Sequence, residues 1–183
     1  MARLFAALAL PETVRTELAA LAAPMAGVRW LPPENLHLTL RFIGPTTPEQ
    51  QEAFETALGR IRVEPFILPV NGVGLFPTRG PSRVLWAGLH HAHPRLFQLR
   101  QQVDEALLAV DPALDVSRFH PHVTLARLDR DHDSGQLAKF LQRHAAFEAP
   151  PFGVSEFHLL ASELQAGAPP LYHTVGTYPL HSK

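Results

Sequence analysis

The order of hydrophobic and polar positions along this chain predicts strands and helices in turn. Apolar residues run almost unbroken through residues 3–10, which is typical of a buried strand. In residues 94–110 they return every three or four positions, which is typical of a helix with one buried face. A capping box with proline at the first helical position, in residues 47–50, indicates the start of another helix. The pattern predicts strands at residues 3–10, 28–31, 37–43, 66–76, 83–89, 122–128, 152–164 and 171–180, helices at residues 11–25, 47–60, 94–110 and 134–147, and turns at residues 78–81 and 165–170.

The predicted elements follow the same order twice. A strand, a helix, a long extended segment, a turn and a final strand begin at His37 and again at His122. Phe66 after Pro65 in the first series corresponds to Phe152 after Pro151 in the second, which indicates a weak internal duplication. We therefore expect an α+β fold in which two antiparallel sheets, related by a pseudo-two-fold axis, surround a central cleft with the helices outside. No low-complexity linker separates the halves, so residues 1–183 are expected to form a single two-lobed domain.

One short pattern occurs in both halves at the start of a predicted strand. His37 and Thr39 in the segment LHLTLRF are two residues apart, and so are His122 and Thr124 in the segment PHVTLAR. Residues two apart on a strand point to the same face, so each segment presents an imidazole beside a hydroxyl group. Composition alone would give about 0.1 matches to His–apolar–Thr–apolar in such a chain. Two matches therefore predict one pocket with two histidines and two hydroxyl groups, which suits acid–base chemistry on a phosphate.

Composition narrows the possible functions. The net charge is −1, so a broad basic surface for duplex nucleic acid is not expected, and any contact with nucleic acid should be local, such as with a chain end. The chain has no cysteine, which excludes disulfide bonds and cysteine-based metal sites or nucleophiles. No apolar run approaches the roughly 20 residues that span a bilayer. The apolar start is interpreted as a buried strand rather than a signal peptide because Pro11 and Glu12 follow it, and we expect a cytoplasmic protein.

Three further residues on the motif strands are assigned to a face, and two of them, Arg41 and Arg127, have alternative interpretations. Arg41 shares the face of Thr39 if its strand is regular, and it either supports a phosphate or nucleotide or is a solvated arginine at the strand end. Arg127 points away from His122 in a regular strand, unless a bulge intervenes. Phe42 lies opposite the active face and is expected in the core.

Aromatic and histidine residues outside the motifs were weighed in the same way. Tyr172 and Trp86 either stack on a nucleobase or pack within the sheet; packing is favoured for Trp86, and both interpretations stay open for Tyr172. His90, His91 and His93 cluster in the sequence, but no carboxylate lies at a spacing typical of metal ligands. We interpret them as exposed loop histidines, and no metal site is expected.

The two motifs, at this spacing and in a chain of this size, resemble those of the 2H phosphoesterases. The most similar branch is that of the RNA 2′,3′-cyclic phosphodiesterases, also called 2′-5′ RNA ligases. The resemblance covers most of the chain and includes RLFAALALP near the start, FP at Phe76, RVLW ending at Trp86, and SEL followed by Tyr172. It implies a bilobal α+β fold of the LigT type and a substrate contact for Arg127. It also implies a catalytic tetrad of His37, Thr39, His122 and Thr124.

The reaction that this resemblance implies is hydrolysis of a 2′,3′-cyclic phosphate at an RNA 3′ end to a 2′-phosphate. It implies His37 as proton donor and His122 as proton acceptor, with Thr39 and Thr124 binding the phosphate and without a cofactor. The residues alone are symmetric with respect to the two histidine roles. The reverse reaction would join a 5′-hydroxyl RNA through a 2′-5′ linkage. Two alternatives remain: a phosphodiesterase for small cyclic nucleotides such as ADP-ribose 1″,2″-cyclic phosphate, and a non-catalytic module that binds RNA ends. A monomer is expected because one chain already supplies a two-lobed cleft.

Overall fold

The computed structural model describes residues 2–115, 118–165 and 168–181, with four α-helices and ten β-strands within those ranges. The helices are α1 (Glu12–Ala19), α2 (Pro48–Leu58), α3 (Pro94–Val110) and α4 (Ser134–Arg143), and a short 3₁₀ helix, η1, spans Pro33–Asn35. The strands are β1 (Ala2–Ala9), β2 (Val28–Trp30), β3 (His37–Thr46), β4 (Phe66–Asn71), β5 (Val73–Phe76), β6 (Val84–Gly88), β7 (His122–Leu128), β8 (Glu148–Val154), β9 (Glu156–Glu163) and β10 (Leu171–Pro179).

Most of the predicted elements are present, and the helices differ from the prediction only at their ends. The capping box at the start of α2 is formed: the Thr47 hydroxyl accepts from the Gln50 amide, and the Gln50 side chain accepts from the Thr47 amide. The first helix ends at Ala19 rather than at residue 25, and the last ends at Arg143 rather than at residue 147. The predicted turn at residues 165–170 lies partly outside the described residues.

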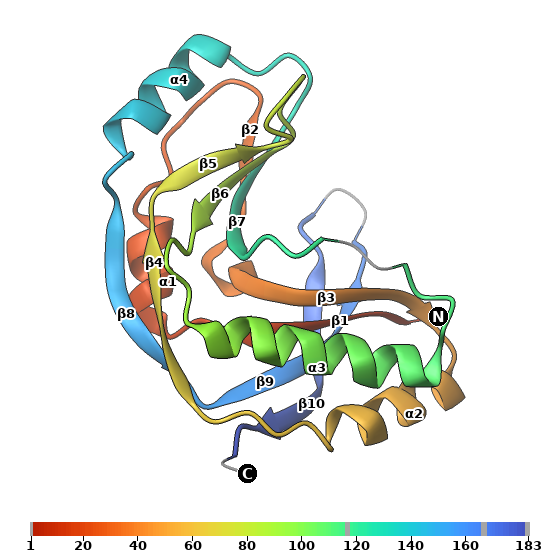
Figure 1. Cartoon of the computed structure of the whole chain (residues 1–183). Helices are drawn as coiled ribbons and strands as arrows, with labels where there is room; N and C mark the ends of the chain where they lie inside the picture. Colours follow the sequence, from red (N-terminus) through yellow and green to blue (C-terminus); the bar gives the residue numbers. More distant parts are fainter. Residues whose placement is uncertain (1, 116–117, 166–167, 182–183) are drawn as a thin grey trace.

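Both long extended segments are divided between two sheets. The first is interrupted at Gly72, which adopts a φ of 69° and separates β4 from β5. The second is interrupted after Val154, between β8 and β9. Strands β4 and β8 pair with each other as a separate two-stranded ribbon, which runs along one side of the molecule in Figure 1. A prediction from hydrophobic pattern alone does not separate these strands because both parts are equally apolar.

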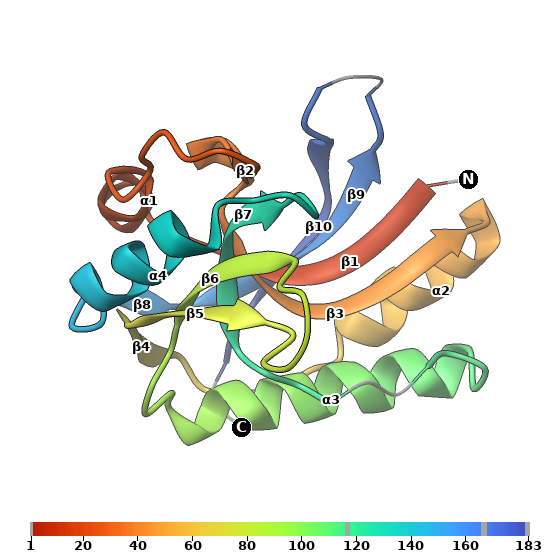
Figure 2. The same cartoon turned by 90° about the horizontal axis from the view of Figure 1, so that it is seen from above.

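The remaining eight strands form two halves that meet at one point. The strand order is β10-β9-β1-β3-β7-β6-β5, and β2 adds to β7. We call β1, β3, β9 and β10 with α2 and α3 the first lobe, and β2, β5, β6 and β7 with α4 the second lobe. Between β3 and β7 the structure records one pair, Leu38 opposite Val123, which we call the seam. Figures 1 and 2 show α2 and α3 beside the first lobe and α4 at the far end of the second lobe. The predicted α+β fold with antiparallel sheets is confirmed.

The hydrophobic core lies behind the motif strands. The apolar stripe predicted for α3 is fully buried, and Leu38 and Val123 at the seam are also buried, at 0% exposure each. This stripe consists of Leu96, Leu99, Val103 and Leu107. The buried face of the motif strands thus fixes them on the core and leaves their other face toward the cleft. No helix within the described residues is long and apolar enough to cross a membrane.

Candidate active site

The four motif residues come together across the seam. Because Leu38 pairs with Val123 in an antiparallel register, the next positions place His37 across from Thr124 and Thr39 across from His122. Directly opposite residues in such a pair lie on the same face. All four side chains are half-buried, while the residues between them are buried. The two motifs therefore lie next to each other at the seam, with their half-buried side chains on the face opposite the core.

Both imidazoles are oriented by the same backbone contact. His37 Nδ1 lies 2.8 Å from the carbonyl oxygen of Asn35, and His122 Nδ1 lies 2.6 Å from that of His120. A carbonyl oxygen only accepts hydrogen bonds, so Nδ1 carries the proton and donates it in both rings. In the neutral ring, Nε2 is then the free base. The Thr39 hydroxyl donates to His37 Nε2 over 3.0 Å.

Burial makes both imidazoles harder to protonate. Desolvation is the largest influence on His37 and lowers its pKa, as do the charges of His122 and Arg127, while the Asn35 carbonyl raises it. Desolvation is also the largest influence on His122 and lowers its pKa, against the opposing effect of the His120 carbonyl. Both rings are therefore neutral at neutral pH without a bound anion, and a phosphate between them would favour their charged forms.

Arg127 lies on the same face of the sheet as His122 and Thr124, because a bulge interrupts β7. Trp86 pairs with Thr124 and Leu85 pairs with Ala126, so Leu125 is an extra residue on β7. The extra residue reverses the alternation, and Arg127 is exposed where a regular strand would bury it. Its positive charge acts to lower the pKa values of His37, His122 and Tyr172, and it lines one cavity together with Tyr172.

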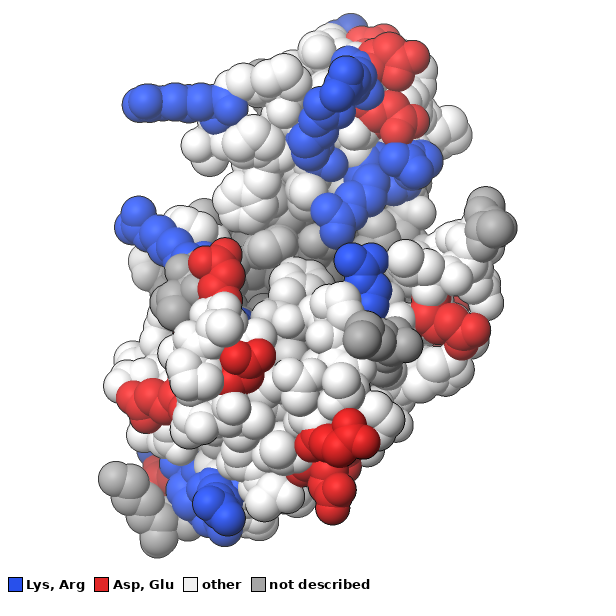
Figure 3. Space-filling view, turned by 90° about the vertical axis from the view of Figure 1, so that its right-hand side faces the viewer, with Lys and Arg blue, Asp and Glu red and all other residues white. Residues whose placement is uncertain are grey.

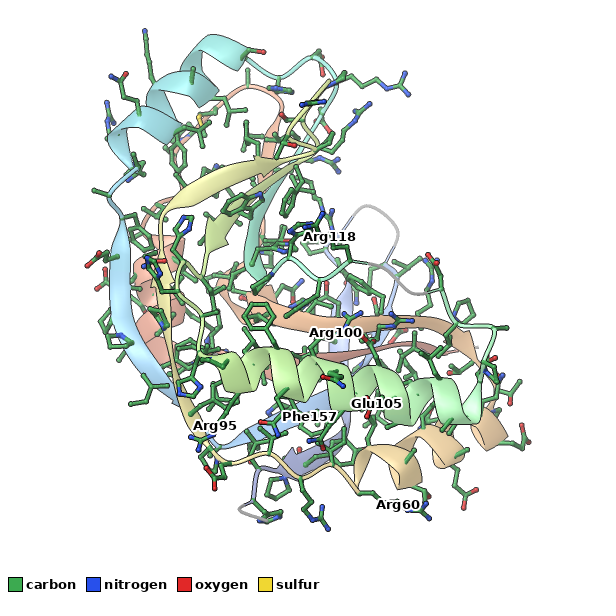
Figure 4. All side chains as sticks on the ribbon, in the orientation of Figure 1. Arg60, Arg95, Arg100, Glu105, Arg118 and Phe157 are labelled. Carbon is green, nitrogen blue, oxygen red and sulfur yellow. The ribbon has the colours of Figure 1, made fainter. Side chains whose placement is uncertain are left out.

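The matching bulge on β3 makes the regular-strand prediction for Arg41 wrong. Ala7 pairs with Thr39 and Ala6 pairs with Arg41, so Leu40 is the extra residue. Arg41 turns from the cleft to α3, where it is 2% exposed and its Nη1 lies 3.2 Å from Asp104 Oδ1. It is therefore buried rather than solvated, although it also lines the cavity that Thr39 and His122 line. Figure 4 shows Arg100 in the same layer between α3 and β3.

The same bulge makes the core prediction for Phe42 wrong. Phe42 is 67% exposed and lies on the cleft face, with its ring centroid 5.8 Å from that of Phe5. The Phe5 ring in turn lies 5.0 Å from the His37 ring. A regular strand would have put Phe42 against the core, so a single extra residue exchanges the surroundings of Phe42 and Arg41.

The tetrad lies in a hollow between the lobes. Figure 3, which faces the open side of the molecule, shows this hollow with Lys and Arg side chains gathered above and beside it. A cavity of about 240 Å³ beside His122 is lined by Thr39, Phe42, Phe76 and Arg118, among others. Figure 4 shows Arg118 next to the opening between the lobes.

Comparison with known proteins identifies the family. The family model described as LigT like Phosphoesterase matches residues 8–86 and residues 90–170. The chain belongs to the LigT-like phosphoesterases. The first matched stretch contains His37 and Thr39, and the second contains His122 and Thr124.

Three relatives named RNA 2′,3′-cyclic phosphodiesterase show how far the sequence similarity extends. That of Aeropyrum pernix is 33% identical, over 78% of this chain and 80% of its own length. That of Escherichia coli is 31% identical over 90% and 89%, and that of Thermus thermophilus is 40% identical over 68% of both chains. The crystal structure of E. coli LigT in apo form aligns with a TM-score of 0.80 at 28% identity, over 99% of this chain and 98% of that one.

Aromatic rings hold both histidines of this LigT-like phosphoesterase. The Tyr172 ring lies 5.3 Å from the His37 ring, edge to face, and the Phe76 ring lies 5.0 Å from the His122 ring in the same geometry. Trp86 packs against Phe76 with 5.1 Å between centroids, which agrees with the packing interpretation. Burial raises the pKa of Tyr172, so its hydroxyl stays protonated and can donate a hydrogen bond.

The clustered histidines of the phosphoesterase have local contacts. The backbone amide of His90 donates to the Asn71 side chain over 2.7 Å, and His93 Nδ1 accepts from the Arg95 amide over 3.1 Å at the start of α3. His90 and His91 are exposed and His93 is half-buried. Within the described ranges, no group of three or more His, Cys, Asp or Glu side chains is arranged to hold a metal ion.

Sequence reasoning missed several residues of the phosphoesterase site. Asn35 orients His37 through its carbonyl, and its buried side chain donates to the Pro170 carbonyl over 2.9 Å. The only sequence signal for it is its position two residues before the motif histidine. Arg29 pairs with Arg127 across β2 and β7, and nothing in the local pattern indicates that pairing.

Proposed function

We propose that this phosphoesterase hydrolyses the 2′,3′-cyclic phosphate at the 3′ end of RNA and leaves a 2′-phosphate. The observation that carries the proposal is the meeting of the two motifs at the seam, where Leu38 pairs with Val123 and the histidine and threonine of each motif share one face of its strand. Relatives named RNA 2′,3′-cyclic phosphodiesterase, at 24–40% identity, support the substrate class. Structures of E. coli LigT complexed with 3′-AMP and with phosphate show that this relative binds such groups.

The proposed chemistry needs one proton acceptor and one proton donor. Water attacks phosphorus while its proton passes to Nε2 of His122, and the bond from phosphorus to the ribose O3′ breaks. Nε2 of His37 gives its proton to that leaving oxygen, and the 2′-phosphate monoester results. The hydroxyl groups of Thr39 and Thr124 donate to the non-bridging oxygens, and Arg127 offsets the added negative charge.

One feature of the cleft supports His37 as the donor. A cavity lined by Tyr172, whose ring packs against His37, gives the RNA chain room to continue on the His37 side of the reacting group. His37 then faces the ribose oxygen that leaves. His122, on the other motif strand, is then left to accept the proton of the attacking water. Joining a 5′-hydroxyl RNA uses the same two groups in the same roles: the hydroxyl attacks phosphorus in place of water and gives its proton to His122, and the leaving O3′ takes a proton from His37.

The test is cleavage of a short RNA that ends in a 2′,3′-cyclic phosphate, with EDTA present. The wild-type protein should give a 2′-phosphate end, and His37→Ala and His122→Ala should each lower the rate by about 10²–10⁴-fold. His173→Ala is the matched control, because His173 is exposed on β10 and pairs only with Glu163 in the described contacts.

Each outcome of this test has a definite meaning. Loss of activity in both motif variants with an unchanged control supports the proposed mechanism. Turnover of small cyclic nucleotides but not of RNA would show that small cyclic nucleotides are the substrate class. RNA binding without turnover would show a non-catalytic module that binds RNA ends. If either motif variant kept the wild-type rate, acid–base catalysis by that histidine would be wrong.

We also propose that the protein acts as a monomer in the cytoplasm. One chain supplies both histidines and both hydroxyl groups of the cleft. The absence of cysteine means that no disulfide links two copies. Sedimentation at several protein concentrations tests this, and active dimers with inactive monomers would contradict it.

A further inference from the structure

A second cavity next to the tetrad is lined by arginines and by flat apolar side chains. Its volume is about 460 Å³, which is within the range of sites that bind small molecules. Its walls come from β2, from β7 and from the segment that leads into β10. They include Arg29, Trp30, Arg127, Pro169, Pro170 and Tyr172.

The two arginines of this cavity are direct neighbours in the sheet. Arg29 pairs with Arg127 in the antiparallel register of β2 and β7, so both side chains lie on the same face with their Cβ atoms about 5 Å apart. Like charges in such positions destabilise a sheet. Their closeness therefore weakens the fold unless an anion lies between or beside them.

The protein itself neutralises only part of this charge. Arg29 Nη2 lies 2.8 Å from Asp129 Oδ1, but the two side chains are 70% and 41% exposed, and exposed pairs contribute little to stability. Arg127 has no ion pair among the described residues. It is the cross-strand neighbour of Arg29 and lines the same cavity as Tyr172, whose ring packs against His37.

Hydrogen bonds and ring packing hold the residues that line the cavity in place. The Asn35 side chain is 5% exposed and holds the Pro170 carbonyl at 2.9 Å, which fixes the segment before β10 over η1. The Trp30 indole nitrogen donates to the Ala23 carbonyl over 2.8 Å, and its ring packs on Phe140. The apolar faces of the cavity are therefore already in place without a ligand.

We propose that this cavity is a second nucleotide subsite, which binds the RNA nucleotide on the 5′ side of the reacting one, with its phosphodiester at Arg29. The inference rests on the proposed function and extends it from an end group to a stretch of RNA. The reacting cyclic phosphate lies at the histidines, and Arg127 bridges to the neighbouring phosphate. The ribose and base of the second nucleotide lie against the aromatic and proline surfaces.

The test compares a mononucleoside 2′,3′-cyclic phosphate with a tetranucleotide that ends in the same group. The measured quantity is the ratio of the kcat/KM value for the tetranucleotide to that for the mononucleotide. Arg29→Ala should lower this ratio about tenfold, because a charge-assisted contact to phosphate is lost, and Arg29→Lys should restore part of it. Arg143→Ala on α4, an exposed arginine that lines neither cavity, is the matched control.

The salt dependence gives a second readout. Neutralising one phosphate of a single strand contributes about −0.7 to the slope of log affinity against log salt concentration. Arg29→Ala should make the slope for the tetranucleotide shallower by about that amount, and Asp129→Asn should tighten tetranucleotide binding, because it removes the competing carboxylate.

The outcomes separate the subsite from the proposed function. If wild-type protein turns over neither substrate, the proposed function fails. If it turns over both and Arg29→Ala leaves the ratio and the salt slope unchanged, the subsite is overturned while the function stands. If Arg29→Ala slows only the joining of a second RNA strand, the cavity holds that strand instead, and the proposal as stated is wrong.

Discussion

Phe42 and Arg127 occupy the same position in the two halves of the molecule. Each lies five residues after a motif histidine, and each is turned onto the cleft face by an extra residue two positions earlier. The two bulges therefore place one apolar ring and one positive charge symmetrically about the tetrad. Both halves of the duplication contain the bulge, but the side chain that it turns to the cleft is Phe42 in one half and Arg127 in the other.

The exposure of Phe42 predicts a small effect of its removal on stability. Phe42→Ala should lower the free energy of unfolding by less than about 1 kcal/mol, because 67% of the side chain is already in water. Phe54→Ala, at 1% exposure on α2, should cost about 3–5 kcal/mol. Urea unfolding of both variants measures this, and equal losses would place Phe42 in the core after all.

The ion pair between Arg41 and Asp104 predicts a structural role for both residues. Asp104 also contacts Arg100, with Nε at 2.7 Å from Oδ2, so Asp104→Asn removes a charge shared by two buried guanidinium groups. Breaking such a buried pair costs about 3–5 kcal/mol of unfolding free energy. Glu64→Gln, which breaks the exposed pair with Arg95, is the control and should cost less than about 1 kcal/mol. Similar unfolding midpoints for the two variants would contradict this.

The lowered pKa values of both histidines predict where activity depends on pH. The kcat/KM value reports the free enzyme, in which burial lowers the pKa of both His37 and His122 below 6.5. The acid must be charged and the base neutral, so the profile should be a bell centred below pH 6.5. Bound phosphate favours the charged rings, so the profile of kcat should lie at higher pH. Initial rates across the histidine range test this, and two coincident bells above pH 7 would refute it.

The same pKa values predict how stability depends on pH. The unfolded chain binds more protons than the folded one between the lowered pKa values and about 6.5. The contribution of the two neutral histidines to the free energy of unfolding should therefore be fully present above about pH 6.5. It should be lost as the pH falls toward and through the lowered pKa values of the folded protein. His37→Gln should flatten this dependence in a series of urea titrations. An unchanged slope in the variant would show that His37 does not contribute to it.

The two contacts of Asn35 predict a positioning role for this residue. Asn35→Asp keeps the shape of the side chain but loses the amide donor to the Pro170 carbonyl. We expect a loss of about 1 kcal/mol in unfolding free energy and a KM value several-fold higher, since the segment before β10 is released. Asn71→Asp, whose amide oxygen accepts from His90, is the control. A lower kcat with an unchanged KM would assign Asn35 to the orientation of His37 instead.

The sequence predicted the tetrad because its signal is local. The motif of residues 37–39 and that of residues 122–124 each lie within one strand, where alternation fixes the shared face. The positions of Arg41 and Phe42 depend on the bulge at Leu40, which appears only in the register with β1. A bulge adds a residue without changing the hydrophobic pattern before it, so periodicity alone extrapolates the wrong face beyond it.

The hydrophobic pattern of the sequence also could not predict contacts between residues far apart along the chain. The pairing of Arg29 with Arg127 joins residues almost a hundred positions apart, and the hydrogen bond from Asn35 to Pro170 joins residues still farther apart. Both depend on how the lobes and the segment before β10 are placed. For these residues only the tertiary structure supplies the information.

The spacing of the cleft depends on a seam of one residue pair. The proton donor and the proton acceptor of the proposed reaction belong to different lobes, and within the sheet these lobes are joined at Leu38 and Val123. A rotation at this joint changes the separation of the two imidazoles without disturbing the backbone contact that orients either ring. The buried side chains of Leu38 and Val123 therefore help to set the distance between donor and acceptor, although neither lies on the cleft face.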